Sequence, residues 1–348
     1  MNSFENELKL PCALDEVDWF LSRPQAGAIE TLRSLEGDIL VLGAGGKMGL
    51  HFCLLLKRVL ADLDKGNRLF AASRFSSLNS TSAYEAKGIE TLAGDFRDSN
   101  FVESLPDCPT VFYLVGAKFG TSGNPDLLRE INVEVSARIA ERFRNSKIVA
   151  FSTGCVYSYV KPESGGARET SETQPIGEYA LSCLERERRF QTASESFGTS
   201  VVLIRLNYSV EFRYGVLLDI GQKVRNGESI DVTMGFVNVI WQNDALNQIV
   251  QTLEIAGSPA VPINVTGPDT VSVRELALRF GKRFGKTPKF EGEEAATMWL
   301  SDASESHRRF GEPSVALDTM VEWVAAWLNQ GGATHGKPTG FENRDGKF

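Results

Sequence analysis

Two patterns of apolar and polar positions alternate along the chain. Residues 39–42 are four consecutive apolar residues, the pattern of a strand buried on both faces. Residues 47–61 then have the apolar content of a packed helix, and a second apolar run follows at 68–73. Since parallel strands are joined by helical crossovers, the pattern predicts a βαβ unit at the start of a sheet.

The alternation of strands and helices continues beyond this unit. Repeated βα units predict an α/β fold, a Rossmann-like doubly wound parallel sheet with helices on both faces and ligands at the carboxyl ends of the strands. Further strands are expected at 89–92, 111–115, 147–151 and 200–206, and further helices at 80–87, 98–104, 127–143, 179–194, 216–226 and 244–255.

Four segments are predicted from these patterns. The first is a helical N-terminal extension, and the second is a nucleotide-binding domain. The third is a smaller region that mainly binds substrate, with some elements returning to the sheet, and the fourth is a polar, glycine-rich tail. Their expected bounds are 1–36, 37–210, 211–330 and 331–348, with helices at 14–21 and 28–35 in the extension and at 271–284 and 317–328 in the smaller region.

Composition narrows the class of protein. The 348 residues are 42% hydrophobic and 24% charged, as in globular proteins, and the net charge of −8 argues against a nucleic-acid binder. No apolar run reaches the roughly 18 residues of a membrane span, and the acidic N-terminus is unlike a signal peptide, so a cytoplasmic protein is expected. Five scattered cysteines and three histidines predict reduced thiols and no metal site.

The glycines that follow the first strand are candidates for phosphate binding. In Gly43-x-x-Gly46-x-x-Gly49, the first glycine allows a tight turn, the second lets a phosphate approach the backbone, and the third lets the helix lie close to the strand. Free N–H groups of the first helical turn point at the anion. Lys47 and Met48 are expected to contact the cofactor together with these glycines.

The residues after the second strand bear on the choice of cofactor. An acidic residue there would bind the ribose 2′-hydroxyl of NAD. The sequence instead has Ser73 and Arg74, a hydroxyl and a guanidinium that suit the 2′-phosphate of NADP. We therefore favour NADP over NAD, with a surface arginine as the alternative interpretation of Arg74.

Several motifs, taken together, point to a known family. The chain resembles the extended short-chain dehydrogenases/reductases, which include NAD(P)-dependent sugar epimerases, dehydratases and reductases, over roughly residues 37–330. The motifs are Gly43-x-x-Gly46-x-x-Gly49, Gly94-Asp95-Phe96-Arg97-Asp98, Leu114-Val115-Gly116-Ala117-Lys118, Asn132-Val133, Phe151-Ser152-Thr153-Gly154-Cys155-Val156-Tyr157, Tyr179 at the start of a helix, and Asn264-Val265-Thr266-Gly267 followed by Val271 to Leu276.

The resemblance implies further cofactor contacts. Asp95 would hold the adenine amino group, although an N-cap of the next helix is an equal alternative. Lys118 would reach the cofactor ribose and phosphates or lie in a solvated loop, and Asn132 would brace the active-site strand or face solvent. The implied contacts after the third and fourth strands are Asp95, Phe96, Val115, Gly116, Ala117 and Lys118.

The same resemblance implies a catalytic pair. Thr153 would hydrogen-bond the reacting oxygen, and Tyr179 would exchange its proton. The family's tyrosine is followed four residues later by a lysine that lowers the tyrosine pKa, but Cys183 occupies that position here. Lys118, or less favourably Arg205, is the candidate replacement cation.

Three other interpretations of the cysteine stay open. Tyr179 can act as a proton donor in a reductase or dehydratase, Cys183 can be a nucleophile, or the chain can be a catalytically silent NAD(P)-binding sensor. The resemblance favours a carbohydrate-like substrate, such as a sugar, a sugar acid or a nucleotide sugar, and a homodimer. Residues expected near the substrate are Thr153, Asn207, Arg213 and Trp241.

Overall fold

A seven-stranded parallel sheet forms the centre of the protein. The computed structural model describes residues 10–76, 78–118 and 124–346, so residues 1–9 of the predicted extension and 347–348 of the predicted tail lie outside it. The strand order is β11-β6-β5-β4-β1-β2-β3. The strands are β1 (Ile39–Leu42), β2 (Leu69–Ser73), β3 (Glu90–Ala93), β4 (Thr110–Tyr113), β5 (Lys147–Thr153), β6 (Val201–Leu206) and β11 (Val261–Val265).

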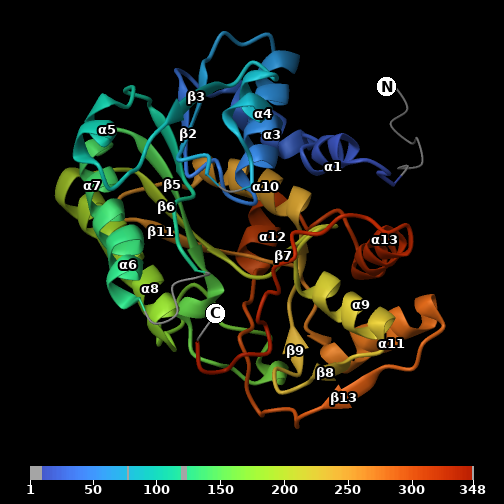
Figure 1. Ribbon diagram of the computed structural model, residues 1–348. Coiled ribbons are helices and arrows are strands. Elements are labelled where there is room, and N and C mark those ends of the chain that lie inside the picture. Colours follow the sequence, from blue (N-terminus) through green and yellow to red (C-terminus); the bar gives the residue numbers. More distant parts are fainter. Residues whose placement is uncertain (1–9, 77, 119–123, 347–348) are drawn as a thin grey trace.

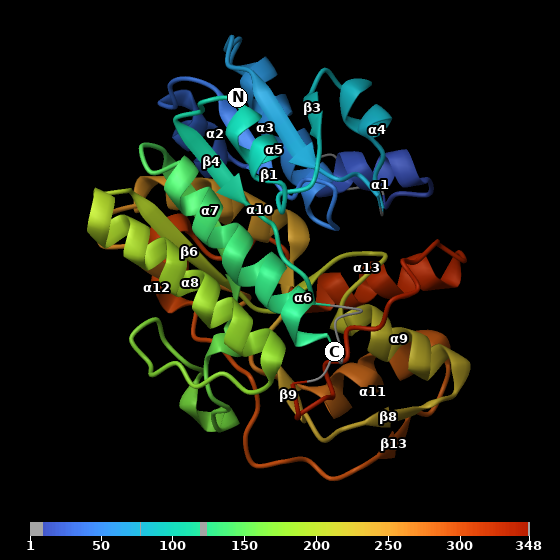
Figure 2. The same cartoon turned by 60° about the vertical axis from the view of Figure 1, so that its left-hand side comes forward.

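Alternating side chains of the strands pack into two separate apolar layers. In β1, Ile39 and Val41 face one cluster, and Leu40 and Leu42 face the other. Helices cover both faces, which confirms the predicted doubly wound α/β fold (Figures 1 and 2). The first face is covered by α2 (Ala26–Arg33), α3 (Gly49–Asp62), α4 (Thr81–Glu85) and α10 (Gln242–Gln251), and the second by α5 (Ser99–Ser104), α7 (Val135–Arg142) and α8 (Glu178–Phe197).

The helix expected at 127–143 is irregular in the structure. It is divided into α6 (Pro125–Arg129), a π-helical turn η1 (Glu130–Glu134), and α7. A π-helical turn accommodates an extra residue and turns side chains relative to a regular helix, and it is frequent at functional sites. This turn contains Asn132, which is fully buried.

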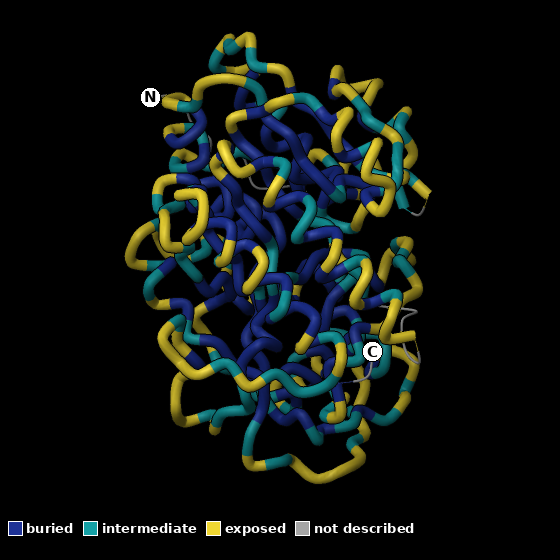
Figure 3. Tube along the Cα trace, turned by 90° about the vertical axis from the view of Figure 1, so that its left-hand side faces the viewer, coloured by how far each residue is buried: buried dark blue, intermediate teal, exposed yellow. Residues whose placement is uncertain are grey.

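A second lobe packs beside the carboxyl ends of the strands. Its core is an aromatic and aliphatic cluster to which α1 contributes Phe20, so the N-terminal extension is packed against this lobe as well as against α3. In the sheet and in the second lobe alike, the buried residues lie in the interior and the exposed ones around the outside (Figure 3). The lobe and its borders contain α1 (Leu14–Leu21), β7 (Ser209–Val210), α9 (Val216–Asn226), β8 (Ser229–Asp231), β9 (Phe236–Val237), β10 (Ile240–Trp241), β12 (Val271–Ser272), α11 (Val273–Phe284), β13 (Lys289–Glu291), α12 (Ser304–Phe310) and α13 (Leu317–Asn329).

The segment after residue 330 has no helix or strand in its described part, yet it is anchored. Phe341 is 1% exposed and belongs to the core of the second lobe. Thr339 donates from both its backbone N and its hydroxyl to Asp219 of α9, and the Tyr159 hydroxyl donates to the Arg344 carbonyl. The tail therefore runs along the border between the sheet and the second lobe (Figure 1).

Candidate active site

The turn between β1 and α3 is shaped by its glycines. Gly43 has φ +81°, and a Cβ there would lie 2.7 Å from the Val115 nitrogen. A Cβ on Gly49 would lie 1.9 Å from the Ala44 carbonyl oxygen, so no larger residue fits without a shift of the backbone. A Cβ on Gly46 would meet only the Gly43 oxygen, at 3.4 Å. Gly46 thus has room on its outer side, as close approach of a ligand to the backbone requires.

We expect Gly49→Ala to destabilise the fold by about 1–3 kcal/mol, because the added methyl group must displace the Ala44 backbone. Urea unfolding of the intact chain measures the change. Gly66→Ala is the matched control, since a Cβ there meets nothing within 4 Å. Equal unfolding free energies for the two variants would contradict the steric explanation.

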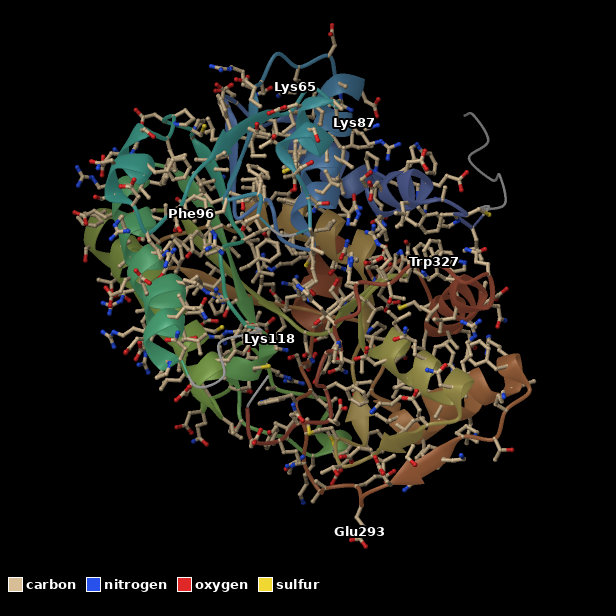
Figure 4. The ribbon with its side chains drawn as sticks, in the orientation of Figure 1. Lys65, Lys87, Phe96, Lys118, Glu293 and Trp327 are labelled. Carbon is tan, nitrogen blue, oxygen red and sulfur yellow. The ribbon has the colours of Figure 1, made fainter. Side chains whose placement is uncertain are left out.

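A crevice of about 190 Å³ opens beside this turn, at the carboxyl ends of the strands. Strand order reverses between β1 and β4, which is where open α/β sheets bind their ligands. Figure 4 shows Phe96 at this upper part of the sheet and Lys118 lower, toward the second lobe. The structure brings these predicted residues together in its lining: Gly43, Gly46, Ser73, Arg74, Asp95, Phe96, Val115, Gly116 and Ala117.

Two predicted polar residues have specific places around the crevice. Asp98, not Asp95, is the N-cap of α5, so the N-cap interpretation of Asp95 is wrong. Arg97 holds the Asp95 carboxylate at 2.7 Å and lowers its pKa. Asn132 accepts from the Ala117 nitrogen and donates to the Ala117 oxygen and to the Ser182 hydroxyl. Asn132 therefore braces the loop after β4 against α8 and does not face solvent.

A second pocket of about 190 Å³ lies where β5 and β6 end. Thr153 and Tyr179 both line it, so the two predicted hydroxyl residues lie at one cavity. Thr153 is 8% exposed, and its hydroxyl accepts from the Cys155 nitrogen at 3.2 Å. Other predicted residues in the lining are Lys47, Met48, Lys118 and Asn207.

The electrostatics of this second pocket keep its tyrosine protonated. Burial first, and then the neighbouring thiols of Cys183 and Cys155, raise the pKa of Tyr179 well above its usual value. The Lys118 ammonium lies 5.5 Å from the centre of the Tyr179 ring, and burial lowers its pKa. Burial and the charge of Lys118 also lower the pKa of Lys47 to about 7. The pocket therefore contains a tyrosine that stays protonated at neutral pH and two lysines whose charged forms are destabilised by burial.

The amide of Asn207 is unsatisfied at the same pocket. Asn207 is 3% exposed, and its Nδ2 has no hydrogen-bond partner among the described residues. Tyr208, beside it, has φ +39°, a strained value for a residue with a side chain. A buried donor without a partner is costly, and a ligand oxygen would satisfy it.

Two predicted substrate residues are placed elsewhere. Trp241 is fully buried in the core of the second lobe, where it packs against Phe212 at 4.9 Å, so it is a core residue and not a wall of the pocket. Arg213 does not line the pocket: it pairs with Glu211, contacts His51 of α3, and lies 3.7 Å from Asp18 of the N-terminal extension. The prediction that these two residues contact substrate is corrected accordingly.

A buried ion pair is hydrogen-bonded to Ser152, one of the residues that line the pocket. Arg205 and Glu187 are 5% and 1% exposed and lie 2.8 Å apart. Glu187 also accepts from the Ser152 hydroxyl at 2.5 Å, and Arg205 donates to the Tyr157 hydroxyl at 2.8 Å. The Arg205 guanidinium is therefore already bound to Glu187 and Tyr157. It is not the cation that replaces the lysine expected beside Tyr179.

The tail contributes a wall that sequence reasoning missed. Thr339 lines the pocket with Tyr179 and Thr153, although it lies 160 residues beyond Tyr179 in the chain. Tyr214 also lines this pocket, and the Lys47 ammonium lies 3.1 Å from the centre of its ring. Nothing in the polar, glycine-rich sequence of the tail indicates this position, which is fixed by the packing of Phe341 and by the hydrogen bonds from Thr339 to Asp219.

Two features are absent from the described residues. In this part of the chain no group of three or more His, Cys, Asp or Glu side chains could hold a metal ion. No helix there has both the length and the apolar character needed to cross a membrane.

The fold and site define a dinucleotide-binding protein of the doubly wound class. The sequence profile of the NAD dependent epimerase/dehydratase family matches residues 39–220, more than half of the chain. The chain belongs to that family, which the motif resemblance indicated. Among curated proteins, no sequence is significantly similar to this chain.

Solved structures share the fold at low sequence identity. UDP-glucose 4-epimerase of Thermotoga maritima, solved with UDP-glucose, is 18% identical, with a TM-score of 0.69 over 84% of this chain and 99% of that one. UDP-glucose 4-epimerase of Thermus thermophilus, solved with NAD, is 19% identical, with the same TM-score and coverage. dTDP-glucose 4,6-dehydratase of Bacillus anthracis str. Ames, solved with NAD, is 13% identical, with a TM-score of 0.71 over 85% of this chain and 97% of that one.

Proposed function

We propose that the protein is an NAD(P)-dependent enzyme that acts on a hydroxyl-bearing carbon of a sugar, a sugar acid or a nucleotide sugar, as an epimerase, dehydratase or reductase. One observation carries the proposal. Thr153 and Tyr179 line one pocket with the unsatisfied amide of Asn207, at the strand ends next to the glycine turn. Family membership and the sugar-nucleotide enzymes of the same fold support it.

The crevice beside the glycine turn fits a dinucleotide. Gly43, Gly46 and the loop from Val115 to Ala117 leave a backbone-lined space beside β1, and Asp95 stands at its far end. The nicotinamide would supply or accept the hydride. In our proposal the glycine turn holds the pyrophosphate, and the side chains at the end of β2 hold the adenosine ribose.

The protein's own residues handle the proton. A Tyr179 whose pKa is raised by burial stays protonated near neutral pH, so the phenol is better suited to donate a proton to a reacting oxygen than to remove one. Thr153, at the end of β5, would donate a hydrogen bond to the same oxygen. Asn207 would bind another hydroxyl of the substrate through its Nδ2. This arrangement favours the reduction of a carbonyl over the initial oxidation of an alcohol.

The test is turnover of a defined panel. The full chain is incubated with NAD, NADP and their reduced forms against UDP- and dTDP-sugars, free sugars and sugar acids, and the products are separated by chromatography. Conversion of at least one substrate class supports an enzyme. Coenzyme binding without turnover anywhere in the panel would favour the silent sensor and overturn the proposal.

For the coenzyme we propose a preference for NADP. Ser73 and Arg74 line the crevice after β2, where no carboxylate follows the strand directly, and the half-exposed Arg74 guanidinium is 3.9 Å from Asp95. We expect NADPH to bind more tightly than NADH, and Arg74→Ala to reduce the difference by about tenfold, since a charge-assisted hydrogen bond to the 2′-phosphate is worth about 1.5–3 kcal/mol. Isothermal titration measures both affinities. Equal affinities in the unmodified protein would contradict the preference.

A further inference from the structure

Three polar side chains form a continuous line along one face of α8. Tyr179, Cys183 and Arg186 stand four and three residues apart, so they share that face. The Tyr179 hydroxyl and the Cys183 thiol are hydrogen-bonded, and Arg186 Nη2 donates to Cys183 Sγ at 3.2 Å. The line runs from the pocket at Tyr179 into the interior, where Cys183 is fully buried and Arg186 is 5% exposed.

Arg186 carries its charge without an acidic partner. Within the described ranges it forms no ion pair, because the adjacent Glu187 is bound to Arg205. Its Nη1 donates to the Val115 carbonyl at 3.0 Å, and its Nε has no hydrogen-bond partner there. Burying a guanidinium without a counter-charge costs several kcal/mol, so this position is not explained by stability. Buried, uncompensated charges are typical of functional sites.

The loop that lines the cofactor crevice is built around this guanidinium. A Cβ on Gly116 would lie 2.7 Å from Arg186 Nη1. The buried side chain therefore lies against the loop after β4, where its Nη1 donates to the Val115 carbonyl. Its position relative to Cys183 and Tyr179 is fixed by packing.

We propose that Arg186 is a positioning residue that supplies, through the Cys183 thiol, the positive charge that a lysine at position 183 would otherwise supply to Tyr179. The inference rests on the proton-exchanging role proposed for Tyr179. While the phenol is neutral, its hydroxyl donates to the sulfur. When the phenol has given up its proton, the thiol hydrogen turns toward the phenolate oxygen, and the guanidinium continues to donate to the sulfur lone pair. No bond other than hydrogen bonds changes in this relay.

The other groups around the line do not replace Arg186. Lys118 approaches the ring of Tyr179 over its face, and Cys155, a buried thiol, faces the ring and raises the Tyr179 pKa. Around the guanidinium itself stand Tyr113 of β4, a buried phenol, and Glu187, which is already paired. Arg186 is thus the cation of α8 that is linked to Tyr179 by hydrogen bonds.

The test titrates Tyr179 itself. 3,5-Difluorotyrosine, whose phenol is more acidic than that of tyrosine, is incorporated at position 179 of the full chain, and its ¹⁹F resonance is followed against pH. The variants are Arg186→Met, Arg186→Lys and Cys183→Ala, with Arg189→Met, an exposed arginine of the same helix, as the matched control. Circular dichroism confirms that each variant is folded.

We expect Arg186→Met to raise the titration midpoint by about one pH unit, the usual effect of removing a nearby cation. Arg186→Lys and Arg189→Met should stay near the unmodified value. Cys183→Ala removes both a thiol that raises the Tyr179 pKa and the link to Arg186, so in the Cys183→Ala background Arg186→Met should no longer shift the midpoint. Identical midpoints for Arg186→Met and Arg189→Met would overturn the proposal, and so would an undiminished effect of Arg186→Met in the Cys183→Ala background. If Arg186→Met does not fold, Arg186→Gln is compared with Arg189→Met in its place, and identical midpoints for these two overturn the proposal. No substrate or coenzyme is added, so a failure of the proposed reaction leaves this readout intact.

Discussion

Replacing Tyr179 with phenylalanine should lower kcat by about 10²- to 10⁴-fold, the range that a positioned proton donor contributes. The variant removes a single oxygen from the pocket that Tyr179 shares with Thr153, and the ring that packs there remains. We therefore expect coenzyme affinity to change little. Initial rates with the best substrate of the panel and isothermal titration with the coenzyme measure the two quantities separately.

Tyr159→Phe is the control for this substitution. It removes the same atom from a tyrosine that does not line the pocket and whose hydroxyl binds the Arg344 carbonyl instead. If Tyr179→Phe and Tyr159→Phe retain the same kcat, the reacting centre is not at Tyr179.

Replacing Glu187 with glutamine should lower the free energy of unfolding by about 3–5 kcal/mol. Glutamine keeps the volume but not the charge, so the buried Arg205 guanidinium loses the carboxylate that lies 2.8 Å away. The cost comes from the uncompensated charge rather than from a cavity. Urea unfolding at neutral pH measures it.

Glu30→Gln is the control for the buried pair. Its partner Arg33 lies 3.0 Å away, but both side chains are more than half exposed, and exposed pairs of this kind contribute about 0–1 kcal/mol. A Glu187→Gln variant that unfolds within about 1 kcal/mol of the Glu30→Gln variant would show that water or another group satisfies Arg205.

The sheet could be predicted from the sequence because most of its strands are short apolar runs followed by helical segments. The exception is β11 (Val261–Val265), which was not among the predicted strands; it lies in the smaller region, from which some elements were expected to return to the sheet. The structure pairs β11 with β6 at the edge of the sheet, a position that tolerates proline. The sequence pattern alone does not distinguish an edge strand that contains proline from a loop.

The crevice beside the glycine turn was predictable because each of its walls is a short contiguous motif at a strand end. The substrate side was not, because its walls depend on contacts between distant segments. Trp241 packs against Phe20, which is more than 200 residues away in the sequence. The indole is buried because of such distant contacts, which the local sequence does not reveal. Arg186 had a signal that could have been found, since it lies seven residues after Tyr179, on the same helical face.

One residue that lines the pocket, Thr339, belongs to the tail and is not part of the sheet. Thr339 stands beside Tyr179 on a segment that is neither helix nor strand, while Thr153 and Asn207 stand at strand ends. Exchanges at the tail position can therefore alter which ligands enter without disturbing the hydrogen-bonded ladder of the sheet. The lining of the pocket can therefore change through the last part of the chain while the residues at the strand ends keep their places.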